Sequence, residues 1–356
     1  MYGGPALASQ GARAVPSLTY LETEPPFSIG PDPGGGSDAP MALPQIVAVS
    51  VPPPAMKTAQ STAQSAANIV PQGGLFWDGR ADTLQAQAIG PLLNPVEMNG
   101  GSVQLVAAKL RAAPYASLFV QLDGPDIFSS PATAVSEAMS AVARYEVEDP
   151  DFHPYSSKYD AWLAGHARLS QAEMRGYILF NDPSKGDCGA CHLDQPTADG
   201  QPPLFTDHQF EALGVPRNLA LSANQNPAYF DLGLCGPFRK SLAAQTQFCG
   251  MFLTPTLRNT ATRNVFFHNG VYHDLHQVLD FYNFRDAEPE KIYPSGADGA
   301  VAKYDDLPSA YWPNVDTADP PFDRQLGQAP PLSRGEEDDI IAFLKTLTDG
   351  YAPMRG

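Results

Sequence analysis

The sequence predicts a mostly α-helical protein of two domains with long loops. The chain has 356 residues, more than the roughly 100–200 residues of one typical domain, and 43% of them are hydrophobic, which is enough for two cores. Apolar residues recur mainly at helical spacing, and the alternating pattern of strands is scarce. The 30 glycines and 36 prolines indicate long, irregular connections.

The N-terminal domain is placed at residues 1–165. Repeated prolines make the first 55 residues irregular, because proline interrupts both helices and strands. The segment Asp149 to Trp162 is interpreted as a connection. Between these two segments, apolar residues at helical spacing predict helices at 56–69, 82–89, 102–112 and 133–147.

The C-terminal domain is placed at residues 166–350. A capping box of Ser170 with Glu173 opens a helix that runs to about Phe180, and a second box, Ser333 with Glu336, opens the last helix. Residues 193–260 are expected to alternate short helices with loops. Residues 273–284 are predicted to be helical, with apolar side chains on one face at Leu275, Val278, Leu279 and Tyr282.

The charge and hydropathy of the chain argue against two classes of partner. Acidic residues number 39 and basic residues 22, so the formal charge of −17 repels nucleic acid and anionic lipid. No apolar run reaches the roughly 18 residues of a membrane span. The first residues lack a basic and an apolar region, so we expect that a signal peptide was removed or that the native protein starts further upstream.

One short motif indicates the chemistry. Cys188-Gly-Ala-Cys191-His192 is a C-x-x-C-H run, the attachment signal for c-type haem. Two thiols at this spacing lie on one side of a helical turn, where both can bond to one edge of a porphyrin, and the next residue is the axial histidine. The alternatives are a thioredoxin-like pair, which needs no histidine, and a zinc site, for which no second close pair exists. Covalent haem attachment by this motif takes place outside the bacterial cytoplasm, so a periplasmic location is expected.

The other two cysteines, Cys235 and Cys249, are separated by 14 residues. Neither has the spacing for a second haem. In an oxidising compartment we expect them to form a disulfide.

Four stretches resemble the bacterial di-haem cytochrome c peroxidase family, which includes the MauG-type enzymes. They are GGLFWDGRAD at 73–82, QAIGPLLNPVEM at 87–98, the haem motif, and TPTLRN at 254–259 running to FHNG at 267–270. The resemblance implies two cytochrome c-like domains, each with its own haem. It implies peroxidase activity on hydrogen peroxide, with electrons supplied by a small redox protein, or oxidation of a partner protein.

The resemblance assigns roles to individual residues. Trp77 matches the tryptophan between the two haems. His192 becomes the proximal ligand of the C-terminal haem, whose environment also includes Arg258 and His268. Three further residues match the peroxide side of the N-terminal haem, namely Gln87, Pro91 and the acid–base group Glu97.

The resemblance also bears on the sixth ligand of the C-terminal haem. Ordinary members of the family place a methionine on the helix after the FHNG turn, where this chain has Tyr282, as in the MauG-type branch. Two alternatives stay open: Tyr282 as a core aromatic, and Met251 as the ligand.

The chain departs from the family at two points. No cysteine precedes Cys188, so the first haem motif is absent, and a missing N-terminal piece is the preferred explanation. The alternative is a monohaem electron-transfer protein without peroxidase activity. The family often binds one calcium ion between its domains through an asparagine, and Tyr20 occupies the position aligned to it.

Overall fold

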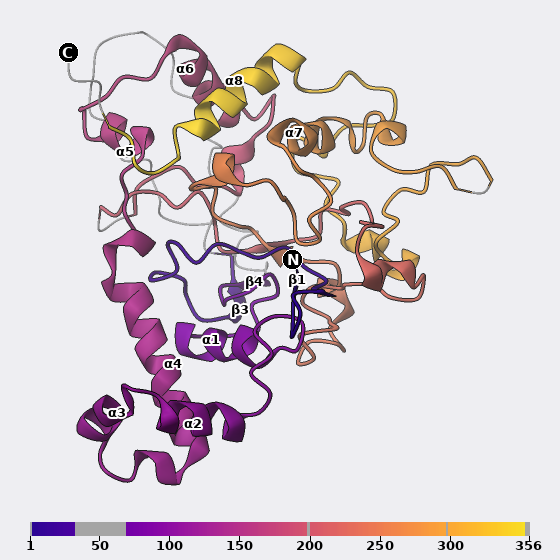
Figure 1. The fold of residues 1–356 in the computed structure, drawn as a ribbon. Helices are drawn as coiled ribbons and strands as arrows, with labels where there is room; N and C mark the ends of the chain where they lie inside the picture. Colours follow the sequence, from indigo (N-terminus) through magenta and orange to yellow (C-terminus); the bar gives the residue numbers. More distant parts are fainter. Residues whose placement is uncertain (1, 33–68, 198–199, 297, 353–356) are drawn as a thin grey trace.

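The computed structural model describes residues 2–32, 69–197, 200–296 and 298–352. Figure 1 shows two groups of helices at opposite ends of the molecule, with loops and short strands between them. The first group consists of α1 (Leu84–Leu93), α2 (Val103–Ala112), α3 (Ala116–Asp123) and α4 (Pro131–Glu148). The second group consists of α5 (Lys158–Leu163), α6 (Gln171–Phe180), α7 (Leu275–Phe284) and α8 (Arg334–Lys345).

Strands are short and form three antiparallel pairs within the described residues. They are β1 (Tyr2–Gly3) with β2 (Ser9–Gln10), β3 (Ser28–Pro31) with β4 (Ile69–Gln72), and β5 (Phe210–Glu211) with β6 (Phe252–Leu253). The prediction of a mostly α-helical chain with scarce strands is therefore confirmed.

Most of the expected helices form close to their predicted bounds, because capping side chains fix where they begin. Ser102 and Ser130 accept hydrogen bonds from backbone N–H groups at the starts of α2 and α4. The capping boxes of α6 and α8 are both present as predicted.

Three local expectations need correction. Two helices, α3 and α5, were not predicted, and α5 lies inside the segment 149–162 that was interpreted as a connection. Between 193 and 260 the expected short helices are 3-10 turns, and the strands β5 and β6 were not predicted. The helix expected at 56–69 lies outside the described residues except for Ile69, which begins β4.

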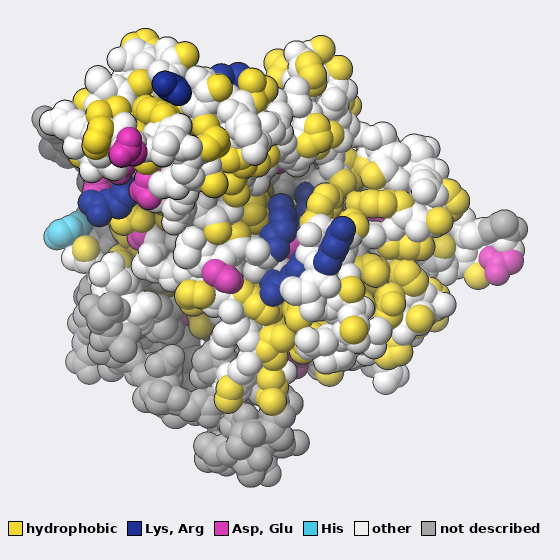
Figure 2. All heavy atoms as spheres, turned by 90° about the horizontal axis from the view of Figure 1, so that it is seen from below, with side chains coloured by type: hydrophobic (Ala, Val, Ile, Leu, Met, Phe, Trp, Pro, Cys, Tyr) yellow, Lys and Arg dark blue, Asp and Glu magenta, His cyan; other side chains and the backbone are white. Residues whose placement is uncertain are grey.

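Each group of helices buries its own apolar cluster. In the first group, the cluster lies among α1, α2 and α4 and includes Val106, Ala134 and Met139. Figure 2 views the molecule from this end, and hydrophobic side chains show at several places on its surface, in keeping with the exposure of Leu118 and Leu122 on α3.

The second cluster is rich in aromatic residues and is centred on the pair α6 and α8. The two helices cross closely at Gly176, where an added Cβ would collide with the Asp339 carbonyl oxygen. This close packing positions the end of α6, which leads directly into the haem motif.

No helix in the described part of the chain combines the length and the apolar character needed to cross a bilayer.

Candidate haem site

A cavity of about 680 Å³ lies against the C-terminal helices and reaches the loops of the N-terminal half. This volume is within the range of cofactor pockets. The residues expected from the sequence that line it are Trp77, Gln87, Cys188, Cys191, His192, Arg258, His268 and Tyr282. Pro91, Glu97 and Met251 are not among its lining residues.

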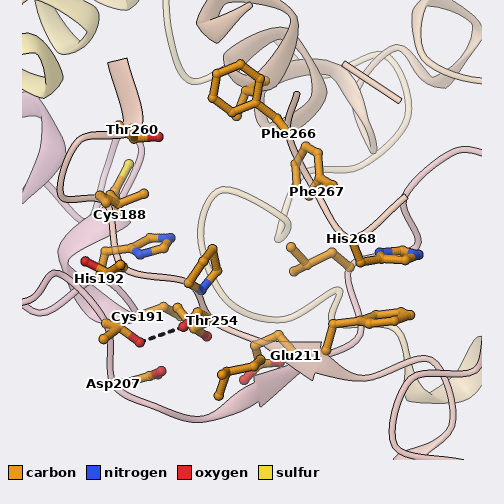
Figure 3. A pocket seen from close by; sticks show the side chains of 18 of the residues that line it. Cys188, Cys191, His192, Asp207, Glu211, Thr254, Thr260, Phe266, Phe267 and His268 are labelled. Atoms are coloured by element: carbon orange, nitrogen blue, oxygen red, sulfur yellow. Dashed lines mark hydrogen bonds between the residues drawn. The ribbon is translucent and has the colours of Figure 1, made fainter. Parts of the chain in front are cut away.

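The haem motif forms one wall of the cavity. After α6 the chain turns through Asp187, whose backbone is left-handed, into a 3-10 turn at Cys188–Ala190. The His192 backbone N–H donates to the Cys188 carbonyl at 2.8 Å, which closes the turn. Both thiols are free, and Figure 3 shows them on the same wall as the His192 ring.

The His192 imidazole is held in the form that can bind iron. Its Nδ1–H donates to the Phe205 carbonyl oxygen at 2.9 Å, so the lone pair lies on Nε2. Burial lowers the pKa of His192 to about 4, which keeps the ring neutral at physiological pH. Phe205 was not singled out from the sequence, because a backbone carbonyl 13 residues away carries no motif.

Tyr282 lies in the wall of the same cavity. It projects from α7 and packs against Phe322, with ring centroids 5.4 Å apart, and against Phe267 at 6.0 Å. Burial, followed by the nearby thiols of Cys188 and Cys191, raises the pKa of the Tyr282 phenol. Such a phenol ionises only when a cation compensates its charge.

His268 lies across the cavity from the motif (Figure 3). Its ring is stacked on Phe252 with centroids 3.6 Å apart, and burial lowers its pKa to about 4. His268 therefore lines the cavity opposite the haem motif, and its Phe252 partner was not predicted from the sequence.

These residues fit a haem of the c type. The cavity offers two adjacent thiols, a neutral imidazole with a fixed tautomer and a buried phenol, among largely apolar walls. Thioether anchors and an axial histidine are the protein groups that such a haem requires.

Trp77 is fastened to the C-terminal half from two sides. Its indole N–H donates to the Ala14 carbonyl at 2.9 Å, and the Ala14 N–H donates to the His268 carbonyl at 2.7 Å. The Trp77 carbonyl accepts from the Leu253 N–H at 3.0 Å. A single residue, Ala14, therefore links the Trp77 indole to the loop that carries His268.

A buried ion-pair network next to Trp77 was not anticipated from the sequence. The Arg13 guanidinium contacts both carboxylate oxygens of Asp231, at 2.6 and 2.7 Å, and Asp78 at 2.8 Å. Arg80 pairs with the other oxygen of Asp78 at 2.8 Å. The network joins residues more than 200 positions apart, so no local pattern could reveal it.

The residues assigned to the peroxide side are not gathered in this cavity. Gln87 on α1 is buried and reaches the cavity wall, whereas Pro91 lies within α1 and away from it. Glu97 follows α1 in a turn, where its Oε2 accepts from the Asn94 side chain at 2.7 Å.

The side chains of Arg258 and Tyr20 both bind carboxylates of this chain. The Arg258 guanidinium is fully buried and binds both carboxylate oxygens of Asp160, at 2.8 and 3.0 Å. The Tyr20 hydroxyl donates to Asp349 at 2.6 Å. Among the described residues there is no cluster of three or more His, Cys, Asp or Glu side chains arranged to bind a metal ion.

The disulfide between Cys235 and Cys249 is present, as predicted. It belongs to an apolar cluster that also contains Met251, and this cluster holds Met251 away from the haem cavity.

Comparisons with known proteins identify relatives of this site. A model of the di-haem cytochrome c peroxidase family matches residues 36–168. The methylamine utilization protein MauG of Paracoccus denitrificans is 33% identical over 288 residues, which cover 80% of this chain and 70% of that protein. Cytochrome c peroxidase Ccp of Escherichia coli is 30% identical over 281 residues, 78% of this chain and 45% of that protein.

The fold has a counterpart among solved structures. The crystal structure of the diheme peroxidase BthA from Burkholderia thailandensis superimposes with a TM-score of 0.80 and 34% identity, over 98% of this chain and 74% of that chain.

The motif, the cavity and the helical scaffold define a c-type haem protein. The chain belongs to the di-haem cytochrome c peroxidase family and is a MauG-type member of it. It is a peroxidase-type oxidoreductase with covalently bound haem c.

Proposed function

We propose that the protein reduces hydrogen peroxide, with electrons that pass through the C-terminal haem and Trp77. The observation that carries the proposal is the shared cavity, because His192 and Tyr282 both line it and the Trp77 indole reaches it from the N-terminal half. The haem, when bound, supplies an iron ion that exchanges electrons one at a time.

The roles of the chain's own residues follow from the contacts. Cys188 and Cys191 would anchor the haem edge, and His192 would bind the iron through Nε2, since its Nδ1–H donates to the Phe205 carbonyl. Tyr282 is proposed as the sixth ligand. Its position in the cavity wall supports this role, and the exclusion of Met251 from that wall argues against a thioether.

In this proposal the N-terminal half belongs to a second haem. Gln87, Pro91 and Glu97 would line its peroxide side, with Glu97 moving a proton between the two oxygen atoms of peroxide. The proposal divides the chain into cytochrome c-like domains at 1–165 and 166–350, although α5 packs on the apolar cluster of the C-terminal domain.

The proposal includes a periplasmic location and a partner that supplies electrons. That partner is a small redox protein or, in a MauG-type reaction, a protein substrate that is oxidised. The Cys235–Cys249 disulfide supports this location, because disulfides persist in oxidising compartments.

A second candidate function is that of a monohaem electron carrier. It is favoured by one specific observation, which is that the haem anchors Cys188 and Cys191 line one cavity together with His192 and Tyr282. A carrier would accept and donate electrons without consuming peroxide.

Stopped-flow mixing of the haem-loaded protein with peroxide separates these functions. Direct reaction of the fully oxidised protein favours a MauG-type enzyme, and a requirement for prior one-electron reduction favours an ordinary peroxidase. We expect peroxide consumption in one of these states, slowed by Trp77→Phe. Absence of reaction in both states would support the carrier.

A further inference from the structure

Helices α5, α6 and α8 lie together at one end of the molecule (Figure 1). They share a cluster of redox-capable aromatic side chains. Trp162 on α5 lies 5.4 Å from Tyr159 and 5.4 Å from Tyr177, measured between ring centroids. Trp162 and Tyr177 are partly exposed, whereas Tyr159 is fully buried. The cluster thus extends from the protein interior to its surface.

The inner end of this cluster contacts the backbone that holds the haem motif. The Tyr159 hydroxyl donates to the Asp194 carbonyl at 3.1 Å, two residues after His192. The Tyr159 ring also lies 5.1 Å from Phe205, whose carbonyl accepts the His192 Nδ1–H. Only one aromatic ring therefore separates the Trp162 indole from groups that touch the proximal side of the haem site.

The other two tryptophans are placed differently. Trp77 donates its indole N–H to the Ala14 carbonyl, and its own carbonyl accepts from the Leu253 N–H of the C-terminal half. Trp312 is more accessible, at 44% exposure, but it packs on Tyr304 at 6.1 Å in a cluster that does not include the residues around His192. Trp312 is thus exposed but away from the haem motif, whereas Trp162 is both partly exposed and close to it.

We propose that Trp162 is the surface relay through which electrons enter the C-terminal haem site from an external one-electron donor. The proposal rests on the peroxidase function proposed above. In each step the Trp162 indole loses one electron inward through Tyr159 and releases its N–H proton to water at the surface. The donor and solvent then restore both. Two such electrons, with two protons, reduce one hydrogen peroxide molecule to two water molecules.

A purely structural role would also bury an indole against Tyr159 and Tyr177, since tryptophan is common in cores. The two roles differ in chemistry. When no donor is supplied, a relay residue is itself oxidised, whereas a packing residue is oxidised only in proportion to its exposure to peroxide.

The test is peptide mapping of the haem-loaded protein after peroxide treatment, with and without ascorbate as the donor, while peroxide consumption is followed in the same samples. We expect oxygen addition at Trp162 to exceed that at Trp312 several-fold and to be suppressed several-fold by ascorbate. In the Cys188→Ala/Cys191→Ala protein, which lacks the haem anchors, we expect more oxygen addition at Trp312 than at Trp162. The Trp162→Phe variant should be oxidised at other residues instead. The control variant Trp312→Phe should keep the oxidation at Trp162.

Each other outcome overturns the proposal in a recognisable way. If peroxide is consumed while Trp312 is oxidised as much as Trp162, or if ascorbate leaves Trp162 oxidation unchanged, Trp162 is a packing residue and the peroxidase function stands. If peroxide is not consumed, the peroxidase function fails and the relay fails with it. The mapping of the unmodified chain needs no variant to fold.

Discussion

The two halves of the chain differ in how they arrange the residues that resemble the family. In the C-terminal half, Cys188, His192 and Tyr282 come from segments about 90 residues apart and meet in one cavity. In the N-terminal half, Gln87 reaches that cavity while Pro91 and Glu97 do not. The C-terminal half is thus a nearly complete haem site within one chain. The N-terminal half presents the family's residues without the thiols that would anchor a haem to them.

The difference shows that the two halves depend on different kinds of interaction. The C-terminal site is shaped by backbone groups, such as the Phe205 carbonyl on His192, and by an aromatic core around α6 and α8. The loops of the N-terminal half are attached to it by the hydrogen bond from the Leu253 N–H to the Trp77 carbonyl and by the ion pair of Arg13 with Asp231. Substitutions in the haem site should therefore change the haem spectra, whereas substitutions in the Arg13 network should change the stability.

The largest effect is expected at the proposed sixth ligand. Tyr282→Phe removes the phenolate oxygen and should change the ferric absorption and electron paramagnetic resonance spectra of the haem-loaded protein. Met251→Leu should change neither, because Met251 lies outside the cavity. No methionine-to-iron charge-transfer band is expected in the unmodified protein. If only the Met251 change altered axial ligation, Tyr282 would be a core aromatic.

Arg13→Met should loosen the attachment between the halves. The side chains of Arg13 and Asp231 are 9% and 6% exposed, so the change leaves Asp231 buried without its main partner. Loss of one partner of a buried pair costs about 3–5 kcal/mol, which chemical denaturation measures. Arg175→Met is the matched control, because Arg175 pairs with Asp339 at the surface and should change stability little. Equal effects of the two variants would contradict the buried network.

The disulfide should stabilise the part of the C-terminal half that holds Met251 away from the haem. Replacing Cys235 and Cys249 by alanine opens a loop with a sequence separation of 14, and the expected loss is about 3 kcal/mol in the free energy of unfolding. Haem content should stay unchanged, since the haem thiols are separate. A loss of haem in this variant would show that the loop helps to form the cavity.

The smallest effect concerns pH. Burial, with the charges of Asp316, Asp207 and Asp319, raises the pKa of Glu211 to about 8. Because the folded state holds this proton more tightly than the unfolded chain, the contribution of Glu211 is fully present below its unfolded pKa and is lost as pH rises through 8. Glu211→Gln should match the unmodified protein at pH 4, below the unfolded pKa, and melt a few degrees higher at pH 9. A melting difference of the same size at pH 4 would mean that the charge of Glu211 is not the cause.

The sequence was sufficient for the haem motif, the capped helices and the disulfide, because each depends on residues close in the chain. Ser170 with Glu173 fixes the start of α6 by a local hydrogen-bond pattern. Helix α3 escaped prediction because Tyr115 provides no side-chain cap at its start. Helix α5 does have a capping box, Ser157 with Asp160, but it is so short that its apolar spacing is not distinctive.

The remainder of the site depends on contacts between distant segments. The Phe205 carbonyl on His192, the Phe252 ring on His268 and the bonding of Trp77 to Ala14 all require the folded chain. The family resemblance indicated which residues matter, and only the three-dimensional arrangement separates Tyr282, which lines the cavity, from Met251, which does not.

The central claim is that this chain carries its haem on the C-terminal motif. Intact-mass measurement of the purified, unmodified protein, followed by mapping of its haem-bearing peptide, tests this claim most directly. We predict a mass increase of one haem for the 356-residue chain, located on the peptide that contains Cys188, Cys191 and His192. A chain without covalent haem after expression with a haem-attachment system, or a haem on any other peptide, would contradict it.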